Sequence, residues 1–225
     1  MLNLIINIPA EIIFSLLYFP SGLFEFVLKK DQLKSGSSKK QIIILHGWLT
    51  KNPLYFLLKH RLEKEGYVVH MPDLGWHLED INLITDKLEK YVKENSLMKF
   101  TIIGHSCGGL IALSYLKRNP KMVNKIITLS TPFSGVSLMN LFSFFSQSAR
   151  QITSYDDFLD NLISGCLPLR HKIYCLFPVF DELFSVKKAQ LPFANNITID
   201  LVGHLPFLYS SIAFKIIKST IKRKI

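Results

Sequence analysis

The chain has 225 residues, of which 48% are hydrophobic and 20% charged, and its formal net charge is +10. This length suits a single domain with a substantial core, and the apolar content excludes an intrinsically disordered chain. The positive charge would suit nucleic acid or an anionic membrane surface, but we find no nucleic-acid-binding motif and therefore predict no nucleic-acid partner.

Residues 1–28 form an apolar segment that prolines interrupt at positions 9 and 20 and glutamates at positions 11 and 25. These interruptions, with the lack of a basic start and of a small-residue cleavage site, make the segment a poor transmembrane span and a poor signal peptide. We expect residues 1–39 to be an apolar segment and linker in contact with a membrane surface, with Lys29 and Lys30 at the headgroups. Packing on the domain and a cleaved signal are the alternatives, and the domain itself is expected over residues 40–225.

The domain opens with a strand signal. Residues 41–45 form a continuous apolar run, typical of a strand buried on both faces of a parallel sheet, and the run ends in His46-Gly47-Trp48. We expect Asn52 to cap a helix that has a proline at its first position, and residues 67–71 to form the next strand.

Residues 99–110 are the most informative stretch of the chain. A β-branched run reaches Gly104, Ser106 stands between Gly104 and Gly108, and apolar residues then recur at helical spacing. A serine at the apex of a strand-to-helix turn needs glycine neighbours, because the backbone there is strained and another segment passes close by. Such a hydroxyl lies at a helix N-terminus, where backbone N–H groups can stabilise a developing oxyanion. The stretch is therefore a candidate nucleophile turn, and a Gly/Ser turn that merely precedes a helix is the alternative.

Strand and helix signals alternate along the rest of the domain. Residues 136–167 are predicted to form a small helical lid insertion over the carboxyl edge of the sheet, with ordinary packing helices as the alternative. The alternation predicts an α/β fold with a mainly parallel sheet and helices on both faces. The other predicted elements are a helix over 81–92 capped by Asp80, strands over 123–129, 171–177 and 196–202, and a helix over 208–221.

A serine nucleophile needs a histidine that takes its proton and a carboxylate that orients the imidazole. Among the seven histidines we choose His204, because it follows the last strand and a glycine that can turn it over the sheet edge. Asp181 follows the penultimate strand among apolar neighbours, which suits a buried orienting carboxylate. The alternatives for the carboxylate are Glu182, Asp156, Asp157 and, inside a strand, Asp200.

These motifs, taken together and in this order, resemble the α/β-hydrolase superfamily over residues 41–223, and within it the bacterial lipase and lipase-like esterase branch. The motifs are His46-Gly47-Trp48, Gly104-His105-Ser106-Cys107-Gly108, Thr131-Pro132-Phe133-Ser134-Gly135, Asp181 and Gly203-His204. The resemblance implies an α/β-hydrolase fold in which Ser106 is the nucleophile, His204 the base and Asp181 its orienting partner. It also implies that Trp48 and Cys107 supply the backbone N–H groups of the oxyanion hole. One departure is that Pro178-Val179-Phe180 replaces the small or polar residues expected before the acid.

The predicted reaction is the hydrolysis of carboxylic esters with apolar acyl chains through an acyl-enzyme, without a metal or organic cofactor. The apolar insertion suggests a lipid or ester substrate, and we expect Phe133, Leu138 and Phe142 to contact it. An acyltransferase, a thioesterase and a non-catalytic protein that binds lipid or a partner are the alternatives. We expect a cytoplasmic protein that is peripheral to a membrane, with secretion as the alternative, and we make no prediction of oligomeric state.

The three cysteines, Cys107, Cys166 and Cys175, do not have the spacing of metal ligands. We therefore predict no zinc site and no disulfide framework, and a bridge between Cys166 and Cys175 stays open. Cys107, beside the predicted nucleophile, is expected to be a small buried residue.

Overall fold

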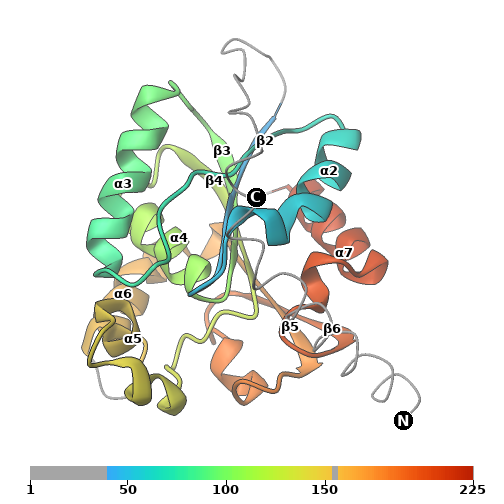
Figure 1. The fold of residues 1–225 in the computed structure, drawn as a ribbon. Helices are drawn as coiled ribbons and strands as arrows, with labels where there is room; N and C mark the ends of the chain where they lie inside the picture. The colour runs from blue at the N-terminus through green and yellow to red at the C-terminus, as the bar shows by residue number, and fades with distance from the viewer. Residues whose placement is uncertain (1–39, 154–156, 225) are drawn as a thin grey trace.

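The computed structural model describes residues 40–153 and 157–224, so the segment predicted for residues 1–39, with its membrane contact, lies outside the described residues. Six strands of the described chain form one sheet in the order β2-β1-β3-β4-β5-β6, with every neighbouring pair parallel (Figure 1). This arrangement confirms the predicted α/β fold with its parallel sheet. The strands are β1 (Gln41–Leu45), β2 (Val68–His70), β3 (Phe100–His105), β4 (Val123–Leu129), β5 (Ile173–Phe180) and β6 (Asn195–Val202).

Helices cover both faces of the sheet (Figure 1). One face carries α2 (Phe56–Lys64) and α7 (Ser211–Lys222). The other carries α3 (Ile81–Glu94), α4 (Cys107–Arg118) and α6 (Asp157–Cys166), with the short α5 (Gln147–Gln151) near its lower end. Short 3-10 segments, each of one or two turns, cover Asn52–Tyr55, Ser137–Phe142, Leu167–Lys172, Val186–Ala189 and Pro206–Leu208. None of the helices in these described ranges is long and apolar enough to cross a bilayer.

The apolar run of β1 explains why the sheet is covered on both sides. Successive side chains of a strand point to opposite faces. Ile42 and Ile44 belong to the core cluster under α2 and α7, whereas Ile43 and Leu45 belong to the cluster under α3 and α4. All four are at most 2% exposed, so the strand is buried on both faces as its sequence predicts.

Several local predictions need correction. Asn52 does not cap a helix, because its side-chain amide donates to the carbonyl of Met71, 3.0 Å away, and the helix proper begins only at Phe56. The strand expected over 171–177 begins at Ile173 and runs on to Phe180. Asp80 does cap α3, since its side chain accepts from the N–H of Asn82. The three cysteines are free and buried, so the open disulfide does not form.

The insertion predicted over 136–167 divides into two parts. The 3-10 turn over 137–142 and α5 lie beside the carboxyl edge of the sheet, where residues of this part line the pocket described below. By contrast, α6 packs against α4, and the Cys166 thiol contacts the carbonyl of Leu113 at 3.6 Å. The second part is therefore an ordinary packing helix.

Candidate active site

Ser106 lies at a sharp turn between β3 and α4. Its backbone has φ 53° and ψ −125°, a strained conformation for a residue with a side chain. Hydrogen bonds hold the turn, because the Ser106 N–H donates to the carbonyl of Leu129 at 2.9 Å and the Thr131 hydroxyl donates to the carbonyl of Ser106 at 3.0 Å. Contacts with β4 and with the loop after it therefore hold Ser106 in this strained conformation.

The two glycines of the turn are required by close backbone approaches. A Cβ on Gly108 would lie 2.4 Å from the carbonyl oxygen of Leu45, and a Cβ on Gly104 would lie 2.5 Å from that of Gly108. Neither approach leaves space for a side chain. Close backbone contacts therefore explain the two glycines of the Gly-x-Ser-x-Gly pattern, as the sequence predicts.

Asp181 and His204 form a buried pair at the carboxyl edge of the sheet. Asp181 follows the last residue of β5, and His204 follows β6 after Gly203, whose φ is 108°. The distance from His204 Nδ1 to Asp181 Oδ2 is 2.7 Å, and the two side chains are 5% and 0% exposed. The Ser130 hydroxyl donates to the same carboxylate oxygen, and the Leu183 N–H donates to the other at 2.9 Å.

These contacts decide the charge of the Asp181 carboxylate. Burial alone would raise its pKa, but the hydrogen bond and positive potential of His204, the Ser130 hydroxyl and the Leu183 N–H together lower the pKa below its ordinary value. The group is therefore ionised at neutral pH. An ionised acceptor at Oδ2 fixes the proton of His204 on Nδ1, so that Nε2 is the ring nitrogen that can accept a proton.

The other carboxylates considered from sequence lie elsewhere. Glu182 accepts the backbone N–H of His204 at 2.9 Å, so its carboxylate contacts the main chain of this loop. Asp157 is exposed on α6, Asp200 is exposed on β6, and Asp156 lies outside the described residues.

A buried hydrogen-bond chain connects three loops of the site, and we call Tyr55 and His105 the Tyr–His brace. The His204 carbonyl can only accept, so His105 Nε2 donates to it at 3.1 Å. His105 Nδ1 must then accept from the Tyr55 hydroxyl at 2.9 Å, while the Tyr55 oxygen accepts the N–H of Gly47 at 2.8 Å. Burial, and then the positive potential of His204, lowers the pKa of His105 to about 3, so the ring stays neutral and keeps this pattern. Sequence analysis missed the brace.

Trp48 and Cys107 are the residues that could donate to an oxyanion. Cys107 is the first residue of α4, where an amide N–H has no acceptor within the helix. The indole of Trp48 donates to the Ser146 hydroxyl at 3.1 Å, which ties its loop to the start of α5. Burial raises the pKa of the Cys107 thiol to about 12, so this cysteine is not an ionised nucleophile at neutral pH.

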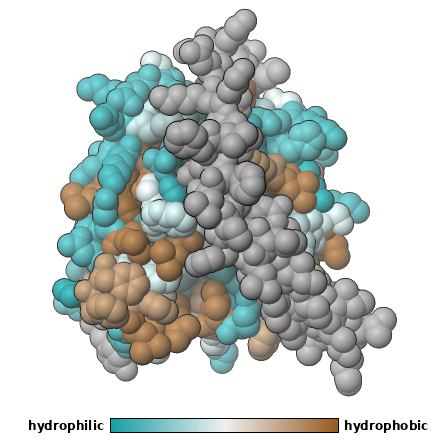
Figure 2. Space-filling model, in the orientation of Figure 1, coloured by the Kyte–Doolittle hydropathy of each residue, from teal (hydrophilic) through white to brown (hydrophobic). Residues whose placement is uncertain are grey.

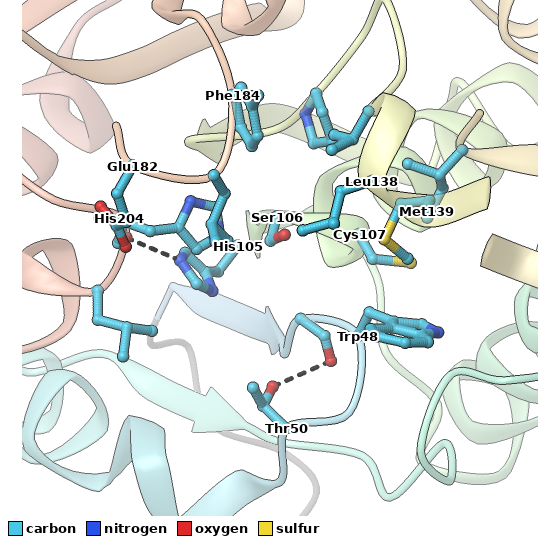
Figure 3. Close-up of a pocket in the computed structure, with 16 residues that line it drawn as sticks. Trp48, Thr50, His105, Ser106, Cys107, Leu138, Met139, Glu182, Phe184 and His204 are labelled. Atoms are coloured by element: carbon cyan, nitrogen blue, oxygen red, sulfur yellow. Dashed lines mark hydrogen bonds between the residues drawn. The ribbon is translucent and has the colours of Figure 1, made fainter. Parts of the chain in front are cut away.

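A cavity of about 250 Å³ lies over Ser106 (Figure 3). Ser106 is at its centre, with His105 and His204 on one side and Leu138, Met139 and Cys107 on the other. The wall is mainly apolar, with Glu182, Thr50 and the two histidines as its polar members. The apolar lining residues are Trp48, Pro132, Val136, Leu138, Met139, Ile152, Leu183, Phe184 and Leu205.

Of the three predicted substrate contacts, Leu138 lines this cavity, whereas Phe133 and Phe142 do not. Phe133 is 1% exposed and packs in the core under α4, because its backbone N–H is held by the Lys188 carbonyl at 2.7 Å and the ring turns inward. Phe142 packs on the indole of Trp48, with ring centroids 5.0 Å apart. The apolar character of the insertion pointed to the correct segment but not to the side chains that face the cavity.

His46, which directly precedes Gly47-Trp48, forms a buried pair with His77. The rings of His46 and His77 stack with centroids 3.8 Å apart and planes 9° apart. Burial lowers the pKa of His46 to about 4 and that of His77 well below its ordinary value. No group of three or more metal-ligating side chains occurs among the residues that the structure describes.

Comparison with known proteins identifies the family. The profile of the alpha/beta hydrolase fold family matches residues 40–179. The chain belongs to this α/β-hydrolase family. A solved α/β hydrolase from the metagenome of lagoon sediments at Mar Chica, Morocco, is 16% identical, with a TM-score of 0.68 over 87% of this chain and 97% of the other. At that identity the likeness concerns the fold.

Curated relatives match only parts of this chain. A human serine hydrolase-like protein is 30% identical over 101 residues, which cover 40% of this chain and 49% of the relative. A 1-acylglycerol-3-phosphate O-acyltransferase of Saccharomyces cerevisiae is 34% identical over 59 residues, which cover 26% of this chain and 15% of the relative. The chain thus spans less than half the length of either of these two relatives.

Proposed function

We propose that this α/β hydrolase cleaves carboxylic esters with apolar acyl chains through a Ser106-His204-Asp181 triad. The observation that carries the proposal is the buried pair of His204 and Asp181, 2.7 Å apart, at the cavity that contains Ser106. The assignment to the lipase-like esterase branch is part of the same proposal.

The reaction proceeds in two halves. His204 Nε2 takes the proton of Ser106 as Oγ attacks the ester carbonyl, and the backbone N–H groups of Trp48 and Cys107 stabilise the oxyanion. His204 then returns the proton to the leaving alcohol as the ester C–O bond breaks. Water, which gives its proton to the same imidazole, attacks the acyl-enzyme and releases the acid with Ser106 restored. The scheme uses no metal or organic cofactor.

The wall of the cavity and the surface beside it support the proposed substrate class. Apolar surface binds an alkyl chain with about 0.8 kcal/mol per buried CH₂. Leu138, Leu141, Phe144 and Phe145, between 49% and 83% exposed, extend the apolar character from the cavity onto the surface over α5 (Figure 2). An acyl chain that leaves the cavity would meet this surface.

Turnover of nitrophenyl acetate, butyrate and octanoate by the wild type and by Ser106→Ala tests the proposal. We expect the variant to lose at least about 10³-fold in kcat, because no nucleophile remains. Equal turnover by the two proteins would contradict it. Binding of esters by a wild type that turns none of them over would support a non-catalytic binding protein instead.

Acyl transfer to an alcohol is the second candidate, and the partial match to a yeast acyltransferase favours it. The same acyl-enzyme would react with a lipid hydroxyl in place of water. Octanoyl ester or thioester is supplied with 1-acylglycerol 3-phosphate, and the products are separated by mass spectrometry. A diacyl product in excess of free octanoate would favour transfer, whereas octanoate alone favours hydrolysis.

A further inference from the structure

A second cavity, of about 320 Å³, lies at the opposite edge of the sheet from Ser106. The starts of β1, β3 and β4 and the end of α7 surround it. Its lining includes six cationic residues: Lys40, Lys99, Lys125, Lys222, Arg223 and Lys224. We call this hollow the basic cavity.

The basic cavity concentrates positive charge. Six of its lining residues are lysine or arginine, and no carboxylate is among the described residues that line it. Other surface lysines of this chain do meet carboxylates, as in the pair of Lys218 with Glu65 at 2.5 Å. Like charges around one hollow repel each other, and a bound anion would remove that repulsion.

Lys125 holds the cationic residues in place. Its side chain is buried, and its ammonium donates to three carbonyls at the end of α7: Thr220 at 2.7 Å, Ile221 at 3.1 Å and Arg223 at 2.8 Å. These hydrogen bonds hold the C-terminal end of α7 against β4, so that residues 222–224 line the cavity. Burial, and then the positive charges of Arg223 and Lys40, lowers the pKa of Lys125.

The lining of the basic cavity also contains the polar side chain of Gln41. The side-chain Oε1 of Gln41 is buried and finds no hydrogen-bond partner in the described part of the chain. Rotation of this amide by 180° would present its NH₂ group at the same place. Ammonium, guanidinium and amide donors together suit the oxygens of a phosphate group.

We propose that the basic cavity binds a phosphate group, carried either by a soluble anion or by a lipid headgroup. This binding is separate from the hydrolysis proposed above and does not require it. The two sources differ in whether the phosphate is free in solution or held in a bilayer.

The test uses the full chain at low ionic strength with two probes. Inorganic phosphate is titrated calorimetrically, and vesicles of phosphatidylcholine with or without phosphatidylglycerol are sedimented with the protein. The variant is Lys99→Asn with Lys222→Gln, because both side chains are exposed and asparagine tolerates the positive φ of 51° at position 99. The control is Lys90→Gln with Lys215→Gln, which removes two exposed charges outside the cavity.

We expect the cavity variant to weaken binding about tenfold and the control to change it by less than about twofold. Binding of phosphate without vesicles identifies a soluble source, and vesicle binding that phosphate competes away identifies a headgroup. The proposal is wrong if neither probe binds the wild type, or if the control loses as much affinity as the cavity variant. We also expect both variants to keep the melting temperature and the ester turnover of the wild type. A loss of phosphate binding is then distinguishable from a failure of the proposed hydrolysis.

Discussion

Tyr55 and His105 are the residues whose roles are least visible in the sequence. Neither is assigned to a chemical step, yet together they connect the N–H of Gly47, one residue before Trp48, to the carbonyl of His204. The brace therefore fixes the position of one proposed oxyanion donor relative to the proposed base.

We predict that Tyr55→Phe lowers kcat by roughly 10- to 100-fold with little change in KM, because small displacements of catalytic groups cost this much. The control is Tyr91→Phe, which removes a similar hydroxyl contact, to His70 Nδ1 at 3.2 Å, on another part of the sheet. Kinetics with nitrophenyl butyrate measure both. Equal losses of kcat in the two variants would contradict the prediction. They would mean that Tyr55 stabilises the fold in general and does not position the catalytic groups.

At the scale of an element, the N-terminus of α4 depends on its contact with β1. We predict that Gly108→Ala costs about 3 kcal/mol or more in the free energy of unfolding, because the new methyl group would lie 2.4 Å from a carbonyl oxygen. Gly66→Ala is the matched control. Its φ is +87° and nothing lies within 4 Å of the added Cβ, so the cost is about 1 kcal/mol of backbone strain. Urea unfolding of both variants measures the difference, and equal costs would contradict the close approach.

We expect the 3-10 segment over 137–142 to contact the acyl chain of the substrate and to determine the preferred chain length. We predict that Leu138→Ser lowers the ratio of kcat/KM for octanoate over acetate by about 5- to 10-fold, because Leu138 lines the cavity. Leu141→Ser, at a residue that is 65% exposed and outside the lining, should leave the ratio unchanged. A fall in the ratio for Leu141→Ser alone would place chain recognition on the outer surface.

Elements were predictable from sequence where local patterns decide them. The strand, turn and helix around Ser106 follow from β-branched residues, two glycines and helical spacing within a dozen positions. The meeting of Asp181 with His204 follows from parallel strands, since carboxyl ends share one edge. By contrast, the direction of Phe133 and the bond of Asn52 to Met71 depend on tertiary packing, which no local pattern encodes. The brace joins residues 50 and 99 positions apart, and for that reason the sequence did not indicate it.

For the whole molecule, buried neutral histidines make stability depend on pH. The pKa of His46 is lowered to about 4 and that of His105 to about 3, from an ordinary value of 6.5 in the unfolded chain. Below pH 6.5 the unfolded state therefore binds protons that the folded state does not, and the free energy of unfolding falls as the pH is lowered. Each histidine contributes a loss of about 2 kcal/mol by pH 5. The lowered pKa of Asp181 adds a further loss at still lower pH, as its carboxylate becomes protonated in the fold.

Urea unfolding at pH 7, 6 and 5 measures this dependence. His77→Asn removes one member of the stacked pair, and asparagine tolerates the φ of 57° at that position, so this variant should lose less stability between pH 7 and pH 5 than the wild type does. A free energy of unfolding that is constant over this range would contradict the neutral state of these rings.

The proposed function depends on the activation of Ser106 by His204, which Asp181 orients. A fluorophosphonate probe with site mapping by mass spectrometry, applied to the wild type and to His204→Ala, tests it most directly. We predict covalent labelling of Ser106 in the wild type and a rate about 10³-fold lower in variant protein that remains folded. Equal rates in the two proteins, or labelling only at another residue, would contradict the account.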